Sequence, residues 1–129
     1  DVERSRGLGD VYKRQILNGR CVILQGNVAD LIFAANQFDL VTAFETIYFW
    51  PDLLQSFREV HRVLKPDGMF LICNECGGDN EKDEKWTEKI DGMTIYKDVQ
   101  LKNILEQTGF RNIQIHKSEK GWLCITAQK

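Results

Sequence analysis

The 129-residue sequence contains no apolar run that approaches the roughly 18 residues of a membrane-spanning helix. It also lacks an excess of positive charge, since 17 lysines and arginines face 19 aspartates and glutamates and the net charge is −2. A chain of this balance has neither the basic surface typical of nucleic-acid binding nor a polybasic membrane patch. We therefore expect a cytoplasmic protein whose partner is a small molecule rather than nucleic acid or a membrane.

Cysteine is scarce, and its four positions do not suggest a disulfide framework. Most of them lie within apolar runs, where a thiol behaves as a small buried hydrophobic group. Cys73 and Cys76 have the spacing of a metal-binding or redox pair, which leaves such a module as an alternative. A structural zinc site needs two further ligands, and none has a matching spacing, so we predict no metal. The four positions are Cys21, Cys73, Cys76 and Cys124.

The composition, 43% hydrophobic and 28% charged, is typical of one globular domain. Residues 1–15 show neither helical nor strand periodicity, and we predict a disordered lead-in. Their sequence resembles translated adapter or vector sequence, in which case these residues are not part of the natural protein. The alternative is a native flexible terminus. Residues 16–129 are assigned to the domain.

Apolar runs predict strands, and amphipathic stretches predict helices between them. Asp52 is expected to cap a helix that ends at Lys65-Pro66-Asp67-Gly68, because proline cannot continue it and Gly68 supplies a positive φ. The link 118–121 is too short for a crossover and therefore predicts a hairpin. Strands are expected at 22–25, 38–43, 69–73, 112–117 and 122–128, helices at 53–64, 86–90 and 99–107, the last of them capped by Asp98, and a mobile loop at 77–85.

The stretch 38–71 runs from a strand through an aromatic loop and a helix to a Pro-Asp-Gly turn and another strand. This order resembles the middle of class I S-adenosylmethionine-dependent methyltransferases. The resemblance implies an α/β, Rossmann-like sheet of order 3-2-1-4-5-7-6 with an antiparallel last strand. On this chain the five predicted strands are similar to strands 3, 4, 5, 6 and 7 of that family, in chain order.

Two elements of that family are absent, namely the glycine-rich turn after strand 1 and the acidic residue that ends strand 2. Gly7-Leu8-Gly9 is no substitute because no apolar strand precedes it. We therefore expect the C-terminal part of one methyltransferase domain, a truncated sheet of strands 4, 5, 7 and 6 with strand 3 displaced or loose. An incomplete fragment would have weak or no activity, and its exposed sheet edge can promote self-association.

The resemblance implies that S-adenosylmethionine is bound by the turn after strand 3 and by the loop after strand 4. In this sequence those positions are Asn27 and Val28, then Ala43, Phe44 and Glu45. An amide oxygen at Asn27 can accept from the adenine amine, although Gly-Asn is also an ordinary turn. Aromatic rings in the loop suit a sulfonium, although they are equally suited to packing the core.

The implied reaction is a direct in-line displacement that moves the methyl group to a small-molecule acceptor. It requires alignment and, for a poor nucleophile, a base. Glu45, Tyr48 and Glu75 are the catalytic candidates, because they follow the carboxyl ends of predicted strands, where α/β sheets bind ligands. A methyltransferase-like interaction domain without catalysis is the alternative function.

Overall fold

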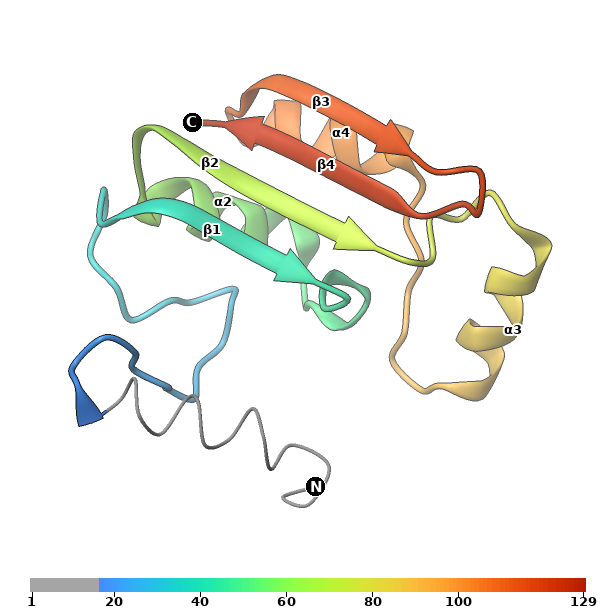
Figure 1. Ribbon diagram of the computed structural model, residues 1–129, viewed down its shortest axis with the longest axis horizontal. Helices are drawn as coiled ribbons and strands as arrows, with labels where there is room; N and C mark the ends of the chain where they lie inside the picture. Colours follow the sequence, from blue (N-terminus) through green and yellow to red (C-terminus); the bar gives the residue numbers. More distant parts are fainter. Residues whose placement is uncertain (1–16) are drawn as a thin grey trace.

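The computed structural model describes residues 17–129, which contain a four-stranded sheet with two helices packed on one face (Figure 1). The predicted lead-in 1–15 lies outside the described residues. The elements in chain order are β1 (Phe38–Phe44), the short 3-10 helix η1 (Ile47–Phe49), α2 (Leu53–Val63), β2 (Leu64–Asn74), α3 (Glu81–Lys89), α4 (Asp98–Gln107), β3 (Arg111–Lys117) and β4 (Leu123–Gln128).

The strands lie in the order β1-β2-β4-β3. β1 and β2 are parallel, as a connection through a helix requires, whereas β4 is antiparallel to both of its neighbours. The hairpin between β3 and β4 closes through Ser118, whose carbonyl oxygen accepts from the Gly121 N–H at 3.0 Å. The predicted strand order 4-5-7-6 with an antiparallel last strand is confirmed.

Residues 22–25 form no strand, which confirms the expectation of a loose strand 3. Their apolar side chains point into solvent, with Val22 73% and Ile23 64% exposed. β1 is the edge of the sheet, and within residues 17–129 no strand pairs with its outer side. The apolar run therefore has the composition of a buried strand, but within residues 17–129 it pairs with no other strand.

The Pro-Asp-Gly segment departs from its predicted role as a helix-ending turn. β2 already begins at Leu64, and the segment forms an irregularity within the β1–β2 ladder. The positive φ falls on Asp67, at 68°, so the expectation that Gly68 supplies it was wrong. Gly68 is required for space instead, because a Cβ there would lie 2.8 Å from the Lys65 carbonyl oxygen and 3.1 Å from that of Asp39.

The predicted mobile loop 77–85 was also wrong over its second half, because α3 already begins at Glu81. The Asn80 side chain caps the helix by accepting from the Lys82 N–H at 3.0 Å. Asp83 is buried and accepts from the Gly78 N–H, also at 3.0 Å. The acidic residues that suggested a solvated loop instead lie in the first turn, where negative charge is favourable.

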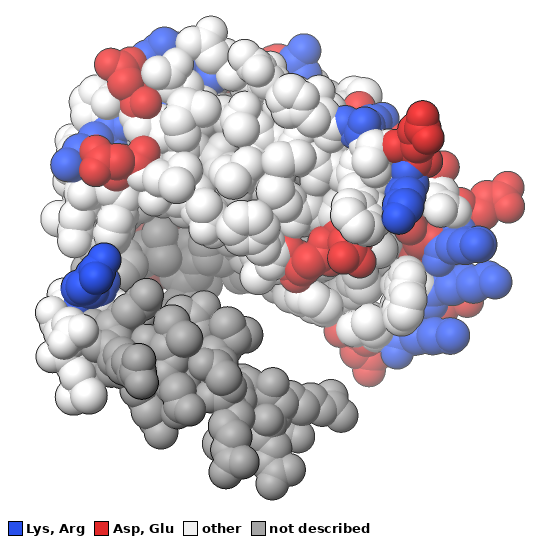
Figure 2. Space-filling model, in the orientation of Figure 1, with Lys and Arg blue, Asp and Glu red and all other residues white. Residues whose placement is uncertain are grey.

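The helices α2 and α4 cover one face of the sheet, and the core lies between these helices and the sheet. On this side Phe70 and Ile72 of β2 are completely buried, and the Phe70 ring meets that of Phe57 edge-on at 5.3 Å. No helix of residues 17–129 covers the other face, where Leu40 and Phe44 are 55% and 56% exposed. Figure 2 shows that its centre carries no charge.

None of the helices within residues 17–129 combines the length and apolar character that crossing a membrane would demand. The predicted cytoplasmic location stays a prediction.

The segment before β1 is anchored to α2 by a buried carboxylate. Glu59 is 8% exposed and accepts from the Leu31 N–H at 2.8 Å and from Arg62 Nε at 2.7 Å. Arg62 in turn donates to the carbonyl oxygens of Leu31 and Phe33. The hydrogen bond from Arg62 lowers the pKa of Glu59 below its ordinary value of 4.5, against the opposing effect of burial.

Replacing Gly68 with alanine is expected to lower the free energy of unfolding by about 1–3 kcal/mol, because the new methyl group meets fixed backbone oxygens. Urea denaturation measures the change. Gly26→Ala is the matched control, since no heavy atom lies within 4 Å of its added Cβ. Equal stability of the two variants would contradict the close approach at Gly68.

Glu59→Gln is expected to destabilise the protein by about 1–3 kcal/mol near neutral pH. A carboxyl whose pKa falls on folding stabilises the protein above its unfolded pKa, and this contribution is lost as the pH drops below that value. The gap between wild type and variant should therefore shrink below pH 4.5. Denaturation at a series of pH values checks this, with Glu106→Gln, an exposed partner of Lys102, as the control.

Candidate functional site

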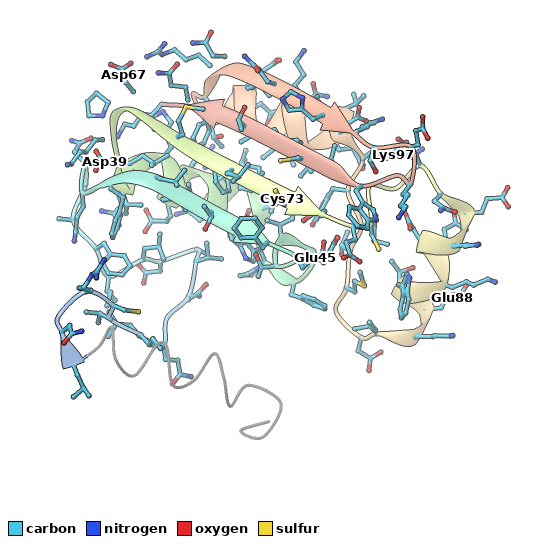
Figure 3. All side chains as sticks on the ribbon, in the orientation of Figure 1. Asp39, Glu45, Asp67, Cys73, Glu88 and Lys97 are labelled. Carbon is cyan, nitrogen blue, oxygen red and sulfur yellow. The ribbon has the colours of Figure 1, made fainter. Side chains whose placement is uncertain are left out.

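The candidate site lies where the parallel strands β1 and β2 end. Both strands run in the same direction, so the residues after them meet at one end of the sheet. Figure 3 shows Glu45 and Cys73 at this end, whereas Asp39 and Asp67 lie at the opposite end. Chain segments 30 residues apart, after β1 and after β2, are thereby brought into contact.

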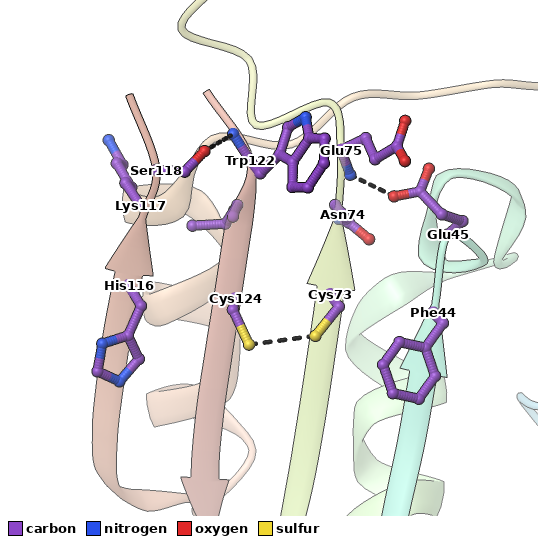
Figure 4. Close-up of a pocket in the computed structure, with 11 residues that line it drawn as sticks. Phe44, Glu45, Cys73, Asn74, Glu75, His116, Lys117, Ser118, Trp122 and Cys124 are labelled. Atoms are coloured by element: carbon purple, nitrogen blue, oxygen red, sulfur yellow. Dashed lines mark hydrogen bonds between the residues drawn. The ribbon is translucent and has the colours of Figure 1, made fainter. Parts of the chain in front are cut away.

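A cavity of about 490 Å³ opens at this end, on the face of the sheet that the helices leave uncovered (Figure 4). Its floor is a row of side chains, one from each strand, that lie opposite one another in the ladder. In spatial order the row is Phe44, Cys73, Cys124 and His116. The rim carries Glu45 and Glu75 on one side and Trp122 on the other, so the cavity has an apolar floor and a polar edge.

Glu45 connects the ends of the two parallel strands. It has a positive φ of 55°, which turns the chain sharply after β1. Its carboxylate accepts from the backbone N–H of Glu75 and, at 3.1 Å, from the Tyr48 hydroxyl. That hydroxyl accepts from the Cys76 N–H at 3.0 Å. The loop after β1 is therefore tied to the segment after β2 at two points.

Burial is the largest cause that raises the pKa of Tyr48, and the nearby Glu45 carboxylate adds to it. Tyr48 therefore stays protonated at neutral pH and acts as a hydrogen-bond donor rather than as a base. Of the three catalytic candidates, Glu45 and Glu75 are exposed and Tyr48 is buried, and only the carboxylate of Glu45 already accepts from two donors.

Asn74 carries the main unsatisfied polar group of the site. It is 2% exposed, and neither its amide oxygen nor its amide nitrogen finds a hydrogen-bond partner within residues 17–129. A buried amide without partners costs about 1–3 kcal/mol, so such groups usually meet a ligand or water. Asn74 is also one of the residues that line the 490 Å³ cavity, but its amide atoms are buried, so a bound molecule reaches them only after the side chain moves.

A second, smaller cavity of about 270 Å³ adjoins the first and shares Glu45 and Glu75 with it. Its walls are mainly apolar and come from three places in the chain: the loop after β1, the segment after β2, and the helix α3 with the residues that follow it. They are formed by Tyr48, Phe49, Cys76, Trp86, Ile90 and Met93. The backbone fixes this arrangement, because the Thr94 N–H donates to the Tyr48 carbonyl oxygen at 2.8 Å.

The structure does not gather all the predicted cofactor residues around one cavity. Phe44 and Glu45 line the large cavity, but Ala43 is 3% exposed and belongs to the core. Asn27 forms an ordinary turn, in which its side chain accepts from the Ala29 N–H at 3.0 Å. Val28 lines a separate cavity of about 220 Å³. The cofactor roles of these residues stay predictions.

The aromatic loop after β1 divides between core and surface. Trp50 stacks on Phe70 with ring centroids 6.1 Å apart and meets Phe57 edge-on at the same distance, so it packs the core. Phe49 is 50% exposed and faces the smaller cavity. The packing alternative therefore holds for Trp50 but not for Phe49.

Sequence reasoning missed Asn74, Trp122 and Cys124 as residues of this site. All three lie at the ends of β2 and β4, and only the antiparallel pairing of these strands brings them together. The available signal was the strand order implied by the family resemblance, which places the antiparallel last strand beside the predicted strand 69–73. The spacing of the cysteines gave no indication of the register.

The fold is that of an open α/β protein, and the candidate site lies at the carboxyl ends of its parallel strands, where such sheets bind ligands. A family profile described as a methyltransferase domain matches residues 4–72, which is more than half of the chain, and the chain therefore belongs to this family. The predicted resemblance to S-adenosylmethionine-dependent methyltransferases is confirmed, and with it the cofactor of the family.

Individual relatives agree with this assignment. The chain is 42% identical over 53 residues to demethylmenaquinone methyltransferase of Lysinibacillus sphaericus and 30% identical over 73 residues to cycloartenol-C-24-methyltransferase 1 of rice, Oryza sativa subsp. japonica. These matches cover 41% and 57% of this chain. A solved SAM-dependent methyltransferase from Thermotoga maritima has a TM-score of 0.72 at 19% identity, covering 89% of this chain and 68% of that one.

The chain spans only part of the curated relatives that it matches. The matched segments are 22% of the Lysinibacillus sphaericus enzyme and 21% of the rice enzyme. These relatives therefore contain most of their length outside the segment that they share with this chain.

Tyr48→Phe is expected to lower the free energy of unfolding by about 1–2 kcal/mol, because the Cys76 N–H loses its acceptor in a part-buried position. Thermal and urea denaturation measure the loss. Tyr96→Phe is the matched control, since Tyr96 packs against the core without entering this network. An unchanged stability of the Tyr48 variant would show that its hydroxyl does not hold the two loops together.

Proposed function

We propose that these residues contribute part of the active site of an S-adenosylmethionine-dependent methyltransferase that methylates a small apolar acceptor by direct in-line displacement. The observation that carries the proposal is the meeting of Glu45 and Glu75 beside an apolar cavity in which the Asn74 amide has no partner. Family membership supports methyl transfer as the chemistry, and the position at the strand ends supports the site.

The residues of the large cavity fit one end of the cofactor. The unpaired Asn74 amide can donate to a carboxylate and accept from an ammonium group, both of which an amino acid moiety carries. The ring of Phe44, 56% exposed, offers its face to a sulfonium. Bound S-adenosylmethionine supplies an electrophilic methyl group. Asn74, Phe44 and Glu45 would hold and orient it.

The two carboxylates have different roles in this proposal. Glu45 is fixed by the Tyr48 hydroxyl and the Glu75 N–H, so it acts as a positioning group that holds the loop and its carboxylate in place. Glu75 is exposed at the edge of both cavities and is the candidate base that takes a proton from the acceptor. The aromatic walls of the smaller cavity suit an apolar acceptor.

The names of two relatives are consistent with such an acceptor, since they give demethylmenaquinone and cycloartenol as the molecules methylated. The net charge of −2 does not favour a nucleic-acid substrate. The smaller cavity, about 270 Å³, admits a compact group or one end of a larger molecule.

We further infer that the chain by itself binds the cofactor weakly. Phe44 and Glu45 line one cavity, whereas Gly26 and Val28 line another, so the predicted cofactor residues do not line a single pocket within residues 17–129. A cofactor held by only part of these residues makes fewer contacts but still loses its translational and rotational entropy, so its affinity is lower. The interpretation of the chain as a fragment stays a prediction.

Titration with S-adenosylmethionine, followed by amide resonances in nuclear magnetic resonance spectra, tests the proposal. Saturable shifts are expected at Phe44, Glu45 and Asn74, with a dissociation constant weaker than about 0.1 mM. Phe44→Ala should abolish them. Leu40→Ala is the matched control, because Leu40 is equally exposed on the same face of β1 but lies at its other end.

Two results would count against the proposal in different ways. Micromolar affinity would show that the residues already form a complete site, and the inferred weak binding would be wrong. If no resonance shifts at millimolar cofactor while the fold is intact, the cofactor does not contact the assigned residues. The second result would favour the alternative of a non-catalytic interaction domain, for which the uncovered sheet face with its exposed Leu40 and Phe44 is the supporting observation.

A further inference from the structure

The floor of the large cavity contains two thiols that face each other across neighbouring strands. Cys73 of β2 and Cys124 of β4 are direct partners in the antiparallel ladder. Their sulfur atoms lie 3.1 Å apart (Figure 4). The two residues are 51 positions apart in the sequence, so only the register of the sheet brings them together.

The backbone at this position already satisfies the distance that a disulfide needs. Directly opposed residues of antiparallel strands have Cα atoms about 4.5–5.5 Å apart, and disulfides join Cα atoms about 4.4–6.8 Å apart. Closing the sulfur distance from 3.1 Å to about 2.05 Å therefore requires side-chain rotation and no shift in strand pairing.

Both sulfurs are accessible to a small oxidant. Cys73 and Cys124 are half-buried and line the cavity of about 490 Å³, which opens on the uncovered face of the sheet. The other cysteines are placed differently. Cys76 lies in the loop after β2 and lines the smaller cavity, and Cys21 precedes the sheet.

We propose that Cys73 and Cys124 form a dithiol site that peroxides convert to an intramolecular disulfide between β2 and β4. The inference goes beyond methyl transfer, because it concerns covalent modification of the sheet itself. A disulfide at this position is reversible by dithiols, and in a reducing compartment it would be transient.

The chemistry balances with hydrogen peroxide as the two-electron oxidant. The thiol of one cysteine loses its proton, and the thiolate attacks a peroxide oxygen. The O–O bond breaks, a sulfenic acid and hydroxide form, and the hydroxide takes up the released proton to become water. The second sulfur then attacks the sulfenic sulfur, the S–O bond breaks, and a second water leaves with the thiol proton. The two sulfurs together lose two electrons, and both peroxide oxygens leave as water.

Burial, together with the neighbouring Cys124 thiol and the Glu45 carboxylate, raises the pKa of Cys73 to about 11. Thiolate is the reactive form, so oxidation is slow near neutral pH and becomes faster as the pH rises. The titratable or charged side chains that share the cavity are Glu45, Glu75, His116, Lys117 and Cys124. The proximity of the second thiol makes disulfide closure, rather than further oxidation, the favoured outcome.

Treatment of the full chain with hydrogen peroxide, followed by thiol titration and peptide mapping under non-reducing conditions, tests the site. The expected result is loss of two of the four thiols and a cross-linked pair of peptides containing Cys73 and Cys124. Dithiothreitol should restore all four. Peptide mapping of the wild type needs no variant, so a folding defect cannot obscure the assignment.

Cys124→Ser and Cys73→Ser should each abolish the cross-link, whereas Cys21→Ser and Cys76→Ser, the matched controls, should retain it. Four unchanged thiols after peroxide treatment would overturn the proposal. So would a link between Cys73 and Cys76 or between two chains. The readout is independent of cofactor binding, so failure here and failure of the proposed function are separate results.

Discussion

The position of β2 between β1 and β4 is the constraint on which the rest of the structure depends. Its residues alternate between a buried side, with Phe70 and Ile72 against the helices, and a side that faces the open cavity. Because β2 pairs with a parallel strand on one edge and an antiparallel strand on the other, its register fixes both neighbours. The core, the Glu45 network and the cysteine pair all follow from that register.

At the site, two residues adopt locally unfavourable states that tertiary contacts maintain. Glu45 takes a positive φ that a glutamate rarely adopts, and two hydrogen bonds to its carboxylate hold the loop there. The Asn74 amide is buried and has no hydrogen-bond partner within residues 17–129. Such a group lowers the stability of the folded protein, and elsewhere in a core it would be paired or replaced by an apolar side chain. Such departures concentrate where a protein is arranged to meet a ligand.

The sequence supported good predictions wherever the signal was local. Asp52 caps α2 as expected, accepting from the Gln55 N–H at 3.2 Å, and four of the five predicted strands correspond to the strands of the sheet. Prediction failed where the local sequence was compatible with two different structures. The acidic run after Gly78 reads as a loop, but capping by Asn80 and the buried Asp83 make it a helix. Glycine at 68 reads as a turn residue, but its role is steric.

The sequence by itself therefore determined most of the helices and strands, because periodicity, caps and turns act over a few residues. Its resemblance to a known family supplied the order of the strands and the region of the site. Only the tertiary structure decided which side chains share a cavity. It placed Asn27 and Ala43 apart from Glu45, and it set Cys73 opposite Cys124 across 51 residues of chain. The physical reason is that strand register is set by long-range pairing and burial, and no short segment of the sequence encodes it.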